Sequence, residues 1–143
     1  MTAAIEYLDL DDLIELSILL LGEPAPIRDV GLLGSAAARP QTTAFGEDAY
    51  PDIWTKSAAL LQSILKNHAL IDGNKRLGWL ATAVFLELNG EAPSMLSNEV
   101  VYELVYAVAA GELAVDEIAS LIRSARMTRN IDVALALVDG IAD

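Results

Sequence analysis

Nine consecutive residues, His68-Ala69-Leu70-Ile71-Asp72-Gly73-Asn74-Lys75-Arg76, hold side chains suited to phosphate chemistry. Asp72 offers hard carboxylate oxygens, which suit a Mg²⁺ ion that is also bound to phosphate oxygens. His68 is the single histidine of the chain. Because imidazole titrates near neutral pH, His68 suits the role of a general base. The stretch therefore brings a candidate base and a candidate metal ligand close together.

The second half of this stretch predicts an anion site at the start of a helix. Gly73 permits a positive φ and a close approach of a ligand to the backbone. The N–H groups of the first helical turn, from Gly73 to Arg76, attract anions through their unpaired donors and the helix dipole. Lys75 and Arg76 add two of the nine basic side chains of the chain. We therefore expect phosphate groups to bind here.

The same residues have a plainer interpretation. A polar Asp-Gly-Asn-Lys-Arg string between two helices is typical of a solvated turn, and a lone histidine is often structural. Residue types and spacing alone favour that interpretation. The phosphate site is supported by the combination of a base, a carboxylate, a glycine turn and two cations within nine residues.

Length and composition exclude several other classes of protein. The chain has 143 residues, of which 54% are hydrophobic and 21% charged, as expected for one folded domain and not for a disordered chain. The absence of cysteine excludes disulfides, thiol chemistry and cysteine-bound zinc. A single histidine excludes a multi-histidine metal site within one chain.

The charge and the apolar runs bear on location and partners. A formal net charge of −12 argues against direct binding to nucleic acid or to an anionic membrane. The longest apolar run, residues 77–86, is shorter than the roughly 18 residues of a membrane span. The N-terminal residues lack the basic start of a secretory signal. We therefore expect a cytoplasmic protein.

Apolar residues at helical spacing predict an all-α fold. The helix at 75–88 is apolar on every side, so we expect it at the centre of the bundle. The stretch 23–50 is expected to be irregular, with strand-like residues in Arg39–Phe45 that predict a small β-hairpin. Residues 1–126 are expected to form the domain and 127–143 an amphipathic tail docked on it. The predicted helices cover residues 10–21, 51–67, 75–88, 98–109 and 116–126.

The stretch His68–Arg76 resembles the core motif of the Fic/Doc family, His-x-Phe-x-Asp/Glu-Gly-Asn-Gly/Lys-Arg. Lys75 stands where most Fic enzymes have a second glycine, and this lysine resembles the Doc ("death on curing") branch of toxin–antitoxin systems. The similarity spans roughly residues 5–125 and includes the segments Ile-Arg-Asp-Val-Gly-Leu-Leu, Ala-Arg-Pro-Gln-Thr and Phe-Leu-Glu-Leu-Asn-Gly.

The resemblance implies a role for each matching residue. His68 would deprotonate the target hydroxyl, and Asp72 would hold Mg²⁺ on the phosphates of ATP. Gly73 and Asn74 would contribute backbone and amide donors to an anion hole, and Lys75 and Arg76 would clamp the phosphates. The hairpin, at about residues 39–46, would be the flap that aligns the target backbone by strand addition.

The resemblance also implies an activity and partners. A Doc-like kinase would transfer the γ-phosphate of ATP to a threonine of elongation factor Tu and arrest translation, and a separate Phd-type antitoxin would inhibit it. The alternatives are a Fic-type AMP-transferase and a non-catalytic module that binds an antitoxin or a translation factor. Leu70, in place of the family phenylalanine, keeps the last alternative open, and Ala69 replaces a frequent proline. Arg28 and Arg39 are interpreted either as phosphate or target contacts or as ordinary surface cations.

Overall fold

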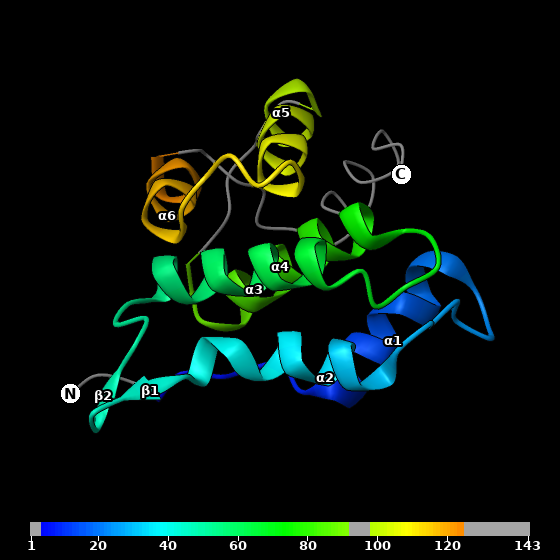
Figure 1. Cartoon of the computed structure of the whole chain (residues 1–143), viewed down its shortest axis with the longest axis horizontal. Coiled ribbons are helices and arrows are strands. Elements are labelled where there is room, and N and C mark those ends of the chain that lie inside the picture. The colour runs from blue at the N-terminus through cyan, green and yellow to red at the C-terminus, as the bar shows by residue number, and fades with distance from the viewer. Residues whose placement is uncertain (1–3, 92–97, 125–143) are drawn as a thin grey trace.

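The computed structural model describes residues 4–91 and 98–124, whose regular elements are helices and one short hairpin (Figure 1). This confirms the predicted all-α class. Four of the five predicted helices match closely, and the fifth can be followed only as far as Ser124. In chain order the elements are α1 (Leu10–Leu21), α2 (Val30–Ala38), a 3-10 turn η1 (Arg39–Gln41), β1 (Thr43–Ala44), β2 (Glu47–Asp48), α3 (Ile53–Asn67), α4 (Asn74–Leu88), α5 (Asn98–Ala109) and α6 (Val115–Ser124).

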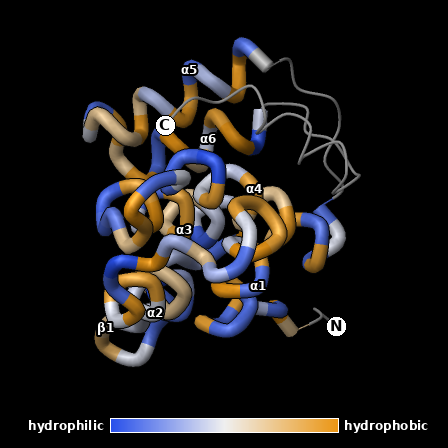
Figure 2. Tube along the Cα trace, turned by 90° about the vertical axis from the view of Figure 1, so that its right-hand side faces the viewer, coloured by the Kyte–Doolittle hydropathy of each residue, from blue (hydrophilic) through white to orange (hydrophobic). Residues whose placement is uncertain are grey.

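The helices pack in three layers (Figure 1). The middle layer consists of α3 and α4, with α1 and α2 on one side and α5 and α6 on the other. Trp79 and Phe85 of α4 are fully buried, one in each of the two hydrophobic clusters that separate the layers. The outer helix α5 alternates hydrophobic and hydrophilic positions (Figure 2). The prediction that the helix at 75–88 lies at the centre is confirmed, and α3 shares that position.

Aspartates begin the first three helices. Asp9, Asp29 and Asp52 each accept a hydrogen bond from a backbone N–H in the first turn of α1, α2 and α3. Such caps satisfy donors that the helix itself leaves unpaired. The cap of α3 is Asp52, so this helix begins two residues later than predicted. The helix α4 differs from these three, because its N-cap is Gly73.

The prediction that residues 23–50 are irregular was wrong in part, because α2 lies inside this stretch. Two glycines and a run of three alanines obscure its helical periodicity. Asp29 nevertheless caps the start of α2, and its successive turns pack on the interior through the buried side chains of Leu33, Ala36 and Ala37.

The hairpin is shorter than predicted and lies later in the chain. Thr43 pairs with Asp48 and Ala44 with Glu47, while Arg39–Gln41 forms a 3-10 turn. The two loop residues, Phe45 and Gly46, both have positive φ (55° and 80°). Positive φ at both central positions matches the right-handed twist of a two-residue hairpin.

The hairpin is attached to the N-terminal end of α3. Lys56 in the first turns of α3 is buried, and its Nζ donates to Asp48 Oδ2 at 3.1 Å and to the carbonyl of Tyr50 at 2.6 Å. The guanidinium of Arg39 donates to the hydroxyl of Tyr50 and to the side chain of Gln62. Arg39 is therefore a structural cation, which corrects both interpretations offered for it from the sequence.

The predicted tail at 127–143, including its amphipathic part from Ile131 to Ile141, lies outside the described residues. Within residues 4–91 and 98–124, the longest helices have 15 residues, and none is long and apolar enough to cross a membrane.

Candidate active site

The motif forms the connection between the two helices of the middle layer. His68 is the C-cap of α3 and has left-handed backbone angles (φ 48°, ψ 47°). Gly73 is the N-cap of α4, with φ at 91°. An added Cβ at Gly73 would lie 2.6 Å from Leu21 Cδ1, so any other residue here would also have to displace the side chain of Leu21 in α1. Both ends of the loop are thus fixed by helices that the core holds in place.

Asn74 closes this loop from the inside. Its buried side chain accepts the N–H of Leu70 at 3.0 Å and donates to the carbonyl of Leu70 at 2.9 Å. Leu70 is itself only 1% exposed, so this leucine anchors the loop in the core. The side-chain amide of Asn74, predicted as an anion donor, is turned into the loop instead. Asn74 can instead offer its backbone N–H, at the start of α4, to an anion.

The segment before α2 lies along the loop and fixes it from the other side. Ile27 and Leu70 form an isolated antiparallel bridge. The backbone N–H of Arg28 donates to the carbonyl of Ala69 at 2.8 Å, and the N–H of Ile71 donates to the carbonyl of Pro26 at 2.8 Å. The motif loop is therefore held by backbone pairing as well as by Asn74.

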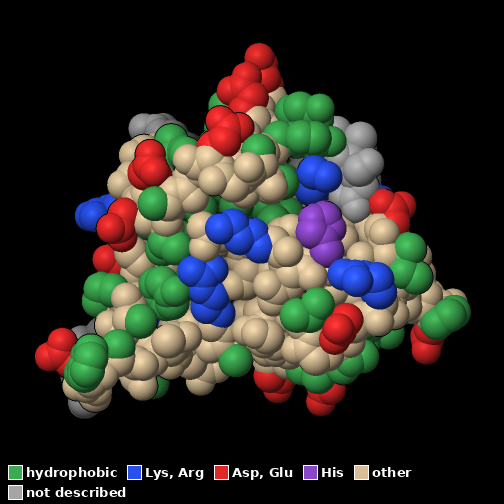
Figure 3. Space-filling view, viewed as in Figure 1, with side chains coloured by type: hydrophobic (Ala, Val, Ile, Leu, Met, Phe, Trp, Pro, Cys, Tyr) green, Lys and Arg blue, Asp and Glu red, His purple; other side chains and the backbone are tan. Residues whose placement is uncertain are grey.

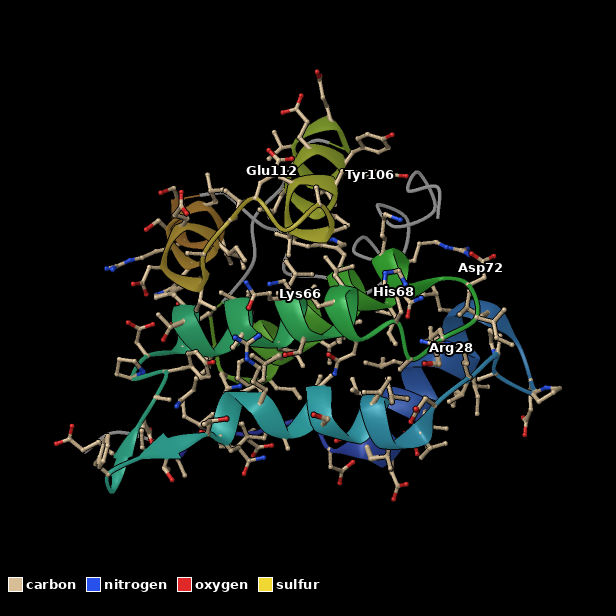
Figure 4. All side chains as sticks on the ribbon, in the orientation of Figure 1. Arg28, Lys66, His68, Asp72, Tyr106 and Glu112 are labelled. Carbon is tan, nitrogen blue, oxygen red and sulfur yellow. The ribbon has the colours of Figure 1, made fainter. Side chains whose placement is uncertain are left out.

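The side chains of His68 and Asp72 are exposed on this framework. Figure 4 shows both at the same end of the bundle, next to Arg28 and below Tyr106. The Oδ1 atom of Asp72 accepts the N–H of Gly73 at 3.0 Å, which orients the carboxylate at the start of α4. Of the predicted site residues, the structure thus brings His68, Asp72 and the first turn of α4 together.

Asp72 fits the way proteins hold Mg²⁺ on a nucleotide. Such ions usually bind one or two carboxylates and complete their shell with phosphate oxygens and water. In the part of the chain that the structure describes, no three His, Cys, Asp or Glu side chains gather as a metal site. An exposed, oriented carboxylate at the start of a helix is the arrangement that such shared coordination would use.

The N-terminus of α4 is the feature most suited to an anion. No side chain caps it, whereas aspartates cap α1, α2 and α3. Backbone N–H groups and the dipole at such an end attract phosphate. With Gly73 in the capping position, no side chain of the N-cap residue competes with an anion for these N–H groups.

Lys75 and Arg76 lie in the first turn of α4, and both are half-buried. The Nζ of Lys75 lies 5.0 Å from the centre of the Tyr106 ring, so a cation–π contact with α5 holds the ammonium. The Nε of Arg76 is buried and has no hydrogen-bond partner among residues 4–91 and 98–124. A buried guanidinium donor without an acceptor is uncommon in folded proteins, and an anion bound at this turn would supply acceptors to the group.

Positive charge gathers around the single histidine (Figure 3). Arg39 and Lys56 are used in internal contacts, as described above. The other described basic residues are Arg123 on α6 and a set that lies in or beside the motif. That set consists of Arg28, Lys66, Lys75 and Arg76. A chain of net charge −12 thus presents a basic surface where the motif reaches solvent.

The structure does not bring the hairpin next to the motif. The hairpin is held at the start of α3, and His68 follows the last residue of that helix. Because α3 has 15 residues, its two ends are about 22 Å apart. The role of the hairpin as a flap over a bound target stays a prediction, and a target strand would have to span this distance.

Two comparisons with known proteins agree with this geometry. The model of the Fic/DOC family matches residues 7–86, more than half of the chain and the whole of the motif. The chain belongs to the Fic/DOC family. It is also 53% identical over 85 residues to a protein named Toxin Doc from Mycolicibacterium smegmatis. That alignment covers 59% of this chain and 65% of the relative, and it confirms the predicted resemblance to the Doc branch.

Three contributions to the site are not evident from the sequence. The internal hydrogen bonds of Asn74, the contact of Arg28 with the loop and the contact of Tyr106 with Lys75 all depend on tertiary structure. Helical spacing places Tyr106 on a predicted helix, but it does not reveal which helix the ring faces.

Proposed function

We propose that this protein is a Doc-like toxin that transfers the γ-phosphate of ATP to a protein hydroxyl. The substrate we propose is a threonine of elongation factor Tu, whose modification would arrest translation. The observation that carries the proposal is the uncapped start of α4, which shares one loop with exposed His68 and Asp72. Membership of the Fic/DOC family and the similarity to a protein named Toxin Doc support it.

ATP would bind with its phosphates at the first turn of α4. The backbone N–H groups there, together with Lys75 and Arg76, would neutralise the triphosphate and fix it in one orientation. Mg²⁺ held by Asp72 would supply further charge neutralisation on the phosphate oxygens. Positioning and electrostatic stabilisation account for most of the rate in phosphoryl transfer, and this turn offers both.

His68 would complete the reaction by accepting a proton. As the target oxygen forms its bond to the γ-phosphorus, its proton passes to a ring nitrogen of His68, and the bond from the γ-phosphorus to the β,γ-bridging oxygen breaks. ADP leaves, and the proton on His68 returns to solvent. The imidazole is exposed, so a protein substrate can reach it.

The partner that we propose as inhibitor is a separate antitoxin of the Phd type, and the compartment is the cytoplasm. The family's inhibitory pattern, Ser/Thr-x-x-x-Glu-Gly/Asn, is matched only up to its last position at Thr43–Asp48 and at Thr2–Tyr7. Inhibition from another chain is therefore favoured over inhibition from within.

The proposal is tested by incubating the purified protein with elongation factor Tu, ATP and Mg²⁺ and measuring the intact mass of the factor. A gain of one phosphoryl group on a threonine supports the proposal. A gain of one AMP would instead indicate a Fic-type AMP-transferase. An unchanged mass, with no phosphorylated protein in a whole lysate either, would contradict a kinase and favour a binding module.

Replacing Asp72 by asparagine is expected to lower the transfer rate at least about 10-fold, since altered metal contacts commonly cost this much. Asparagine keeps an oxygen for the N–H of Gly73 but loses the negative charge that holds Mg²⁺. A titration of the initial rate with Mg²⁺ should show half-saturation at a higher concentration. Glu112→Gln removes one carboxylate from an exposed site and serves as the control. An unchanged Mg²⁺ dependence in Asp72→Asn would exclude Asp72 as the metal ligand.

Replacing Tyr106 by leucine is expected to raise the KM for ATP about two- to fivefold, the equivalent of an exposed cation–π contact of roughly 0.5–1 kcal/mol. The ring then no longer holds the ammonium of Lys75. Tyr106→Phe keeps the ring and should leave the KM unchanged. Steady-state kinetics with varied ATP distinguish the two variants. Equal KM values for leucine and phenylalanine would show that the ring does not act through Lys75.

A further inference from the structure

We propose that Arg28 is a positioning residue that fixes the backbone of His68 and thereby the direction of its imidazole. This inference rests on the proposed role of His68 as the base. It adds to the site a residue that lies forty positions earlier in the chain, outside the motif.

The side chain of Arg28 contacts the carbonyl of His68 with two donors. Its Nε donates at 3.1 Å, and its Nη2 donates to the same oxygen. Hydrogen bonds from a charged guanidinium are stronger than those between neutral groups. The main chain of Arg28 adds a third bond, from its N–H to the carbonyl of Ala69 at 2.8 Å. One residue thus holds two successive carbonyls of the motif.

The conformation of His68 explains why such support is needed. A residue with a side chain adopts the left-handed region (φ 48°, ψ 47° here) at a cost, and it keeps that conformation only where its surroundings impose it. The carbonyl of His68 also lies at the C-terminal end of α3, where the helix dipole favours a cation. Arg28 therefore stabilises the conformation and the helix end together.

Arg28 is in turn fixed by the element that follows it. The N–H of Asp29 donates to the carbonyl of Ala69 at 3.0 Å, and its carboxylate caps α2. The start of α2 and the end of α3 are therefore joined through the two residues before α2. Arg28 is exposed at the same end of the bundle as His68 (Figure 4).

A direct contact with the phosphates of ATP is the competing role for Arg28, and kinetics separate the two. Loss of a positioning residue lowers kcat, because displacement of a reacting group by about 1 Å can cost up to about 100-fold. Loss of a phosphate contact raises the KM for ATP. For Arg28→Ala we expect kcat to fall roughly 10- to 100-fold with the KM for ATP unchanged. Arg28→Lys, which keeps the charge and one donor, should recover part of kcat.

The single histidine gives a second readout that does not need activity. In a ¹H–¹³C NMR spectrum of the imidazole, the ring signals of His68 are identified without assignment. Arg28→Ala should shift and broaden them, and Arg28→Lys should move them less. Arg123→Ala, which removes an exposed cation from α6, should leave both the signals and kcat unchanged. Circular dichroism of each variant establishes that it is folded.

Unchanged ring signals in Arg28→Ala, or a raised KM with an unchanged kcat, would overturn the positioning role. If the wild-type protein transferred no phosphate, the proposed function would fail, and the NMR comparison would still decide whether Arg28 orders His68. The two failures are therefore distinguishable.

Discussion

Replacing His68 by alanine is expected to lower the rate of phosphoryl transfer by about 10²–10⁴-fold, the usual contribution of a general base. The imidazole is the group in the motif loop that can accept the proton of the target hydroxyl near neutral pH. The side chain is exposed, so its removal should leave the free energy of unfolding nearly unchanged. Initial rates and urea unfolding of the two proteins measure the two effects.

Added imidazole provides the control for His68→Ala. Because the position is open to solvent, free imidazole can enter the space that the side chain leaves and restore part of the rate. Binding of ATP should be unaffected, since the phosphates are held at the start of α4. A variant that transfers phosphate at the wild-type rate would exclude His68 as the base.

Replacing Asn74 by alanine is expected to lower the free energy of unfolding by about 2–4 kcal/mol, since each buried backbone group left unpaired costs about 1–3 kcal/mol. The side chain of Asn74 satisfies both the N–H and the carbonyl of Leu70, and all of these groups are buried. Urea unfolding measures the loss. Faster hydrogen exchange of the Leu70 amide would localise it to the motif loop.

Asn74→Asp is the matched variant. Aspartate can still accept the N–H of Leu70, but it has no donor for the carbonyl of Leu70 and brings a negative charge into a buried site. The free energy of unfolding of Asn74→Asp should therefore also fall. The loss should be larger at neutral pH than at a pH low enough to protonate the new carboxyl group. If Asn74→Ala lost less than about 0.5 kcal/mol, the value typical of a surface substitution, the loop would not depend on this side chain.

The helices that frame the site were predictable because local signals define them. Asp9 before an apolar helical pattern fixes the start of α1, and Asn89 with Gly90 ends α4 where the sequence indicates. Local signals also predicted the loop between α3 and α4, because a polar Asp-Gly-Asn-Lys-Arg string separates the two helical patterns. The helix α2 was not, because glycines and alanines give it little apolar contrast.

The roles of single side chains in the site were harder to predict. The sequence predicts that the amide of Asn74 donates to a ligand, but in the structure it donates to the carbonyl of Leu70, four residues earlier. From the sequence, Arg39 is interpreted as a surface cation or as a contact for phosphate or target. In the structure its guanidinium donates to the side chains of Tyr50 and Gln62. Polar residue types indicate where chemistry is possible, whereas packing decides whether a given side chain faces the ligand or the protein. That decision depends on contacts between distant segments.

We propose that ATP is bound so that its γ-phosphate reaches the target. The most direct test incubates the protein with elongation factor Tu and Mg²⁺, using ATP labelled at either the γ- or the α-phosphate, and adds Lys75→Gly as a second enzyme. Our expectation is label on the factor from γ-ATP only, and a reduced yield from Lys75→Gly. Label from α-ATP would contradict it and identify an AMP-transferase in which Lys75 does not determine the reaction.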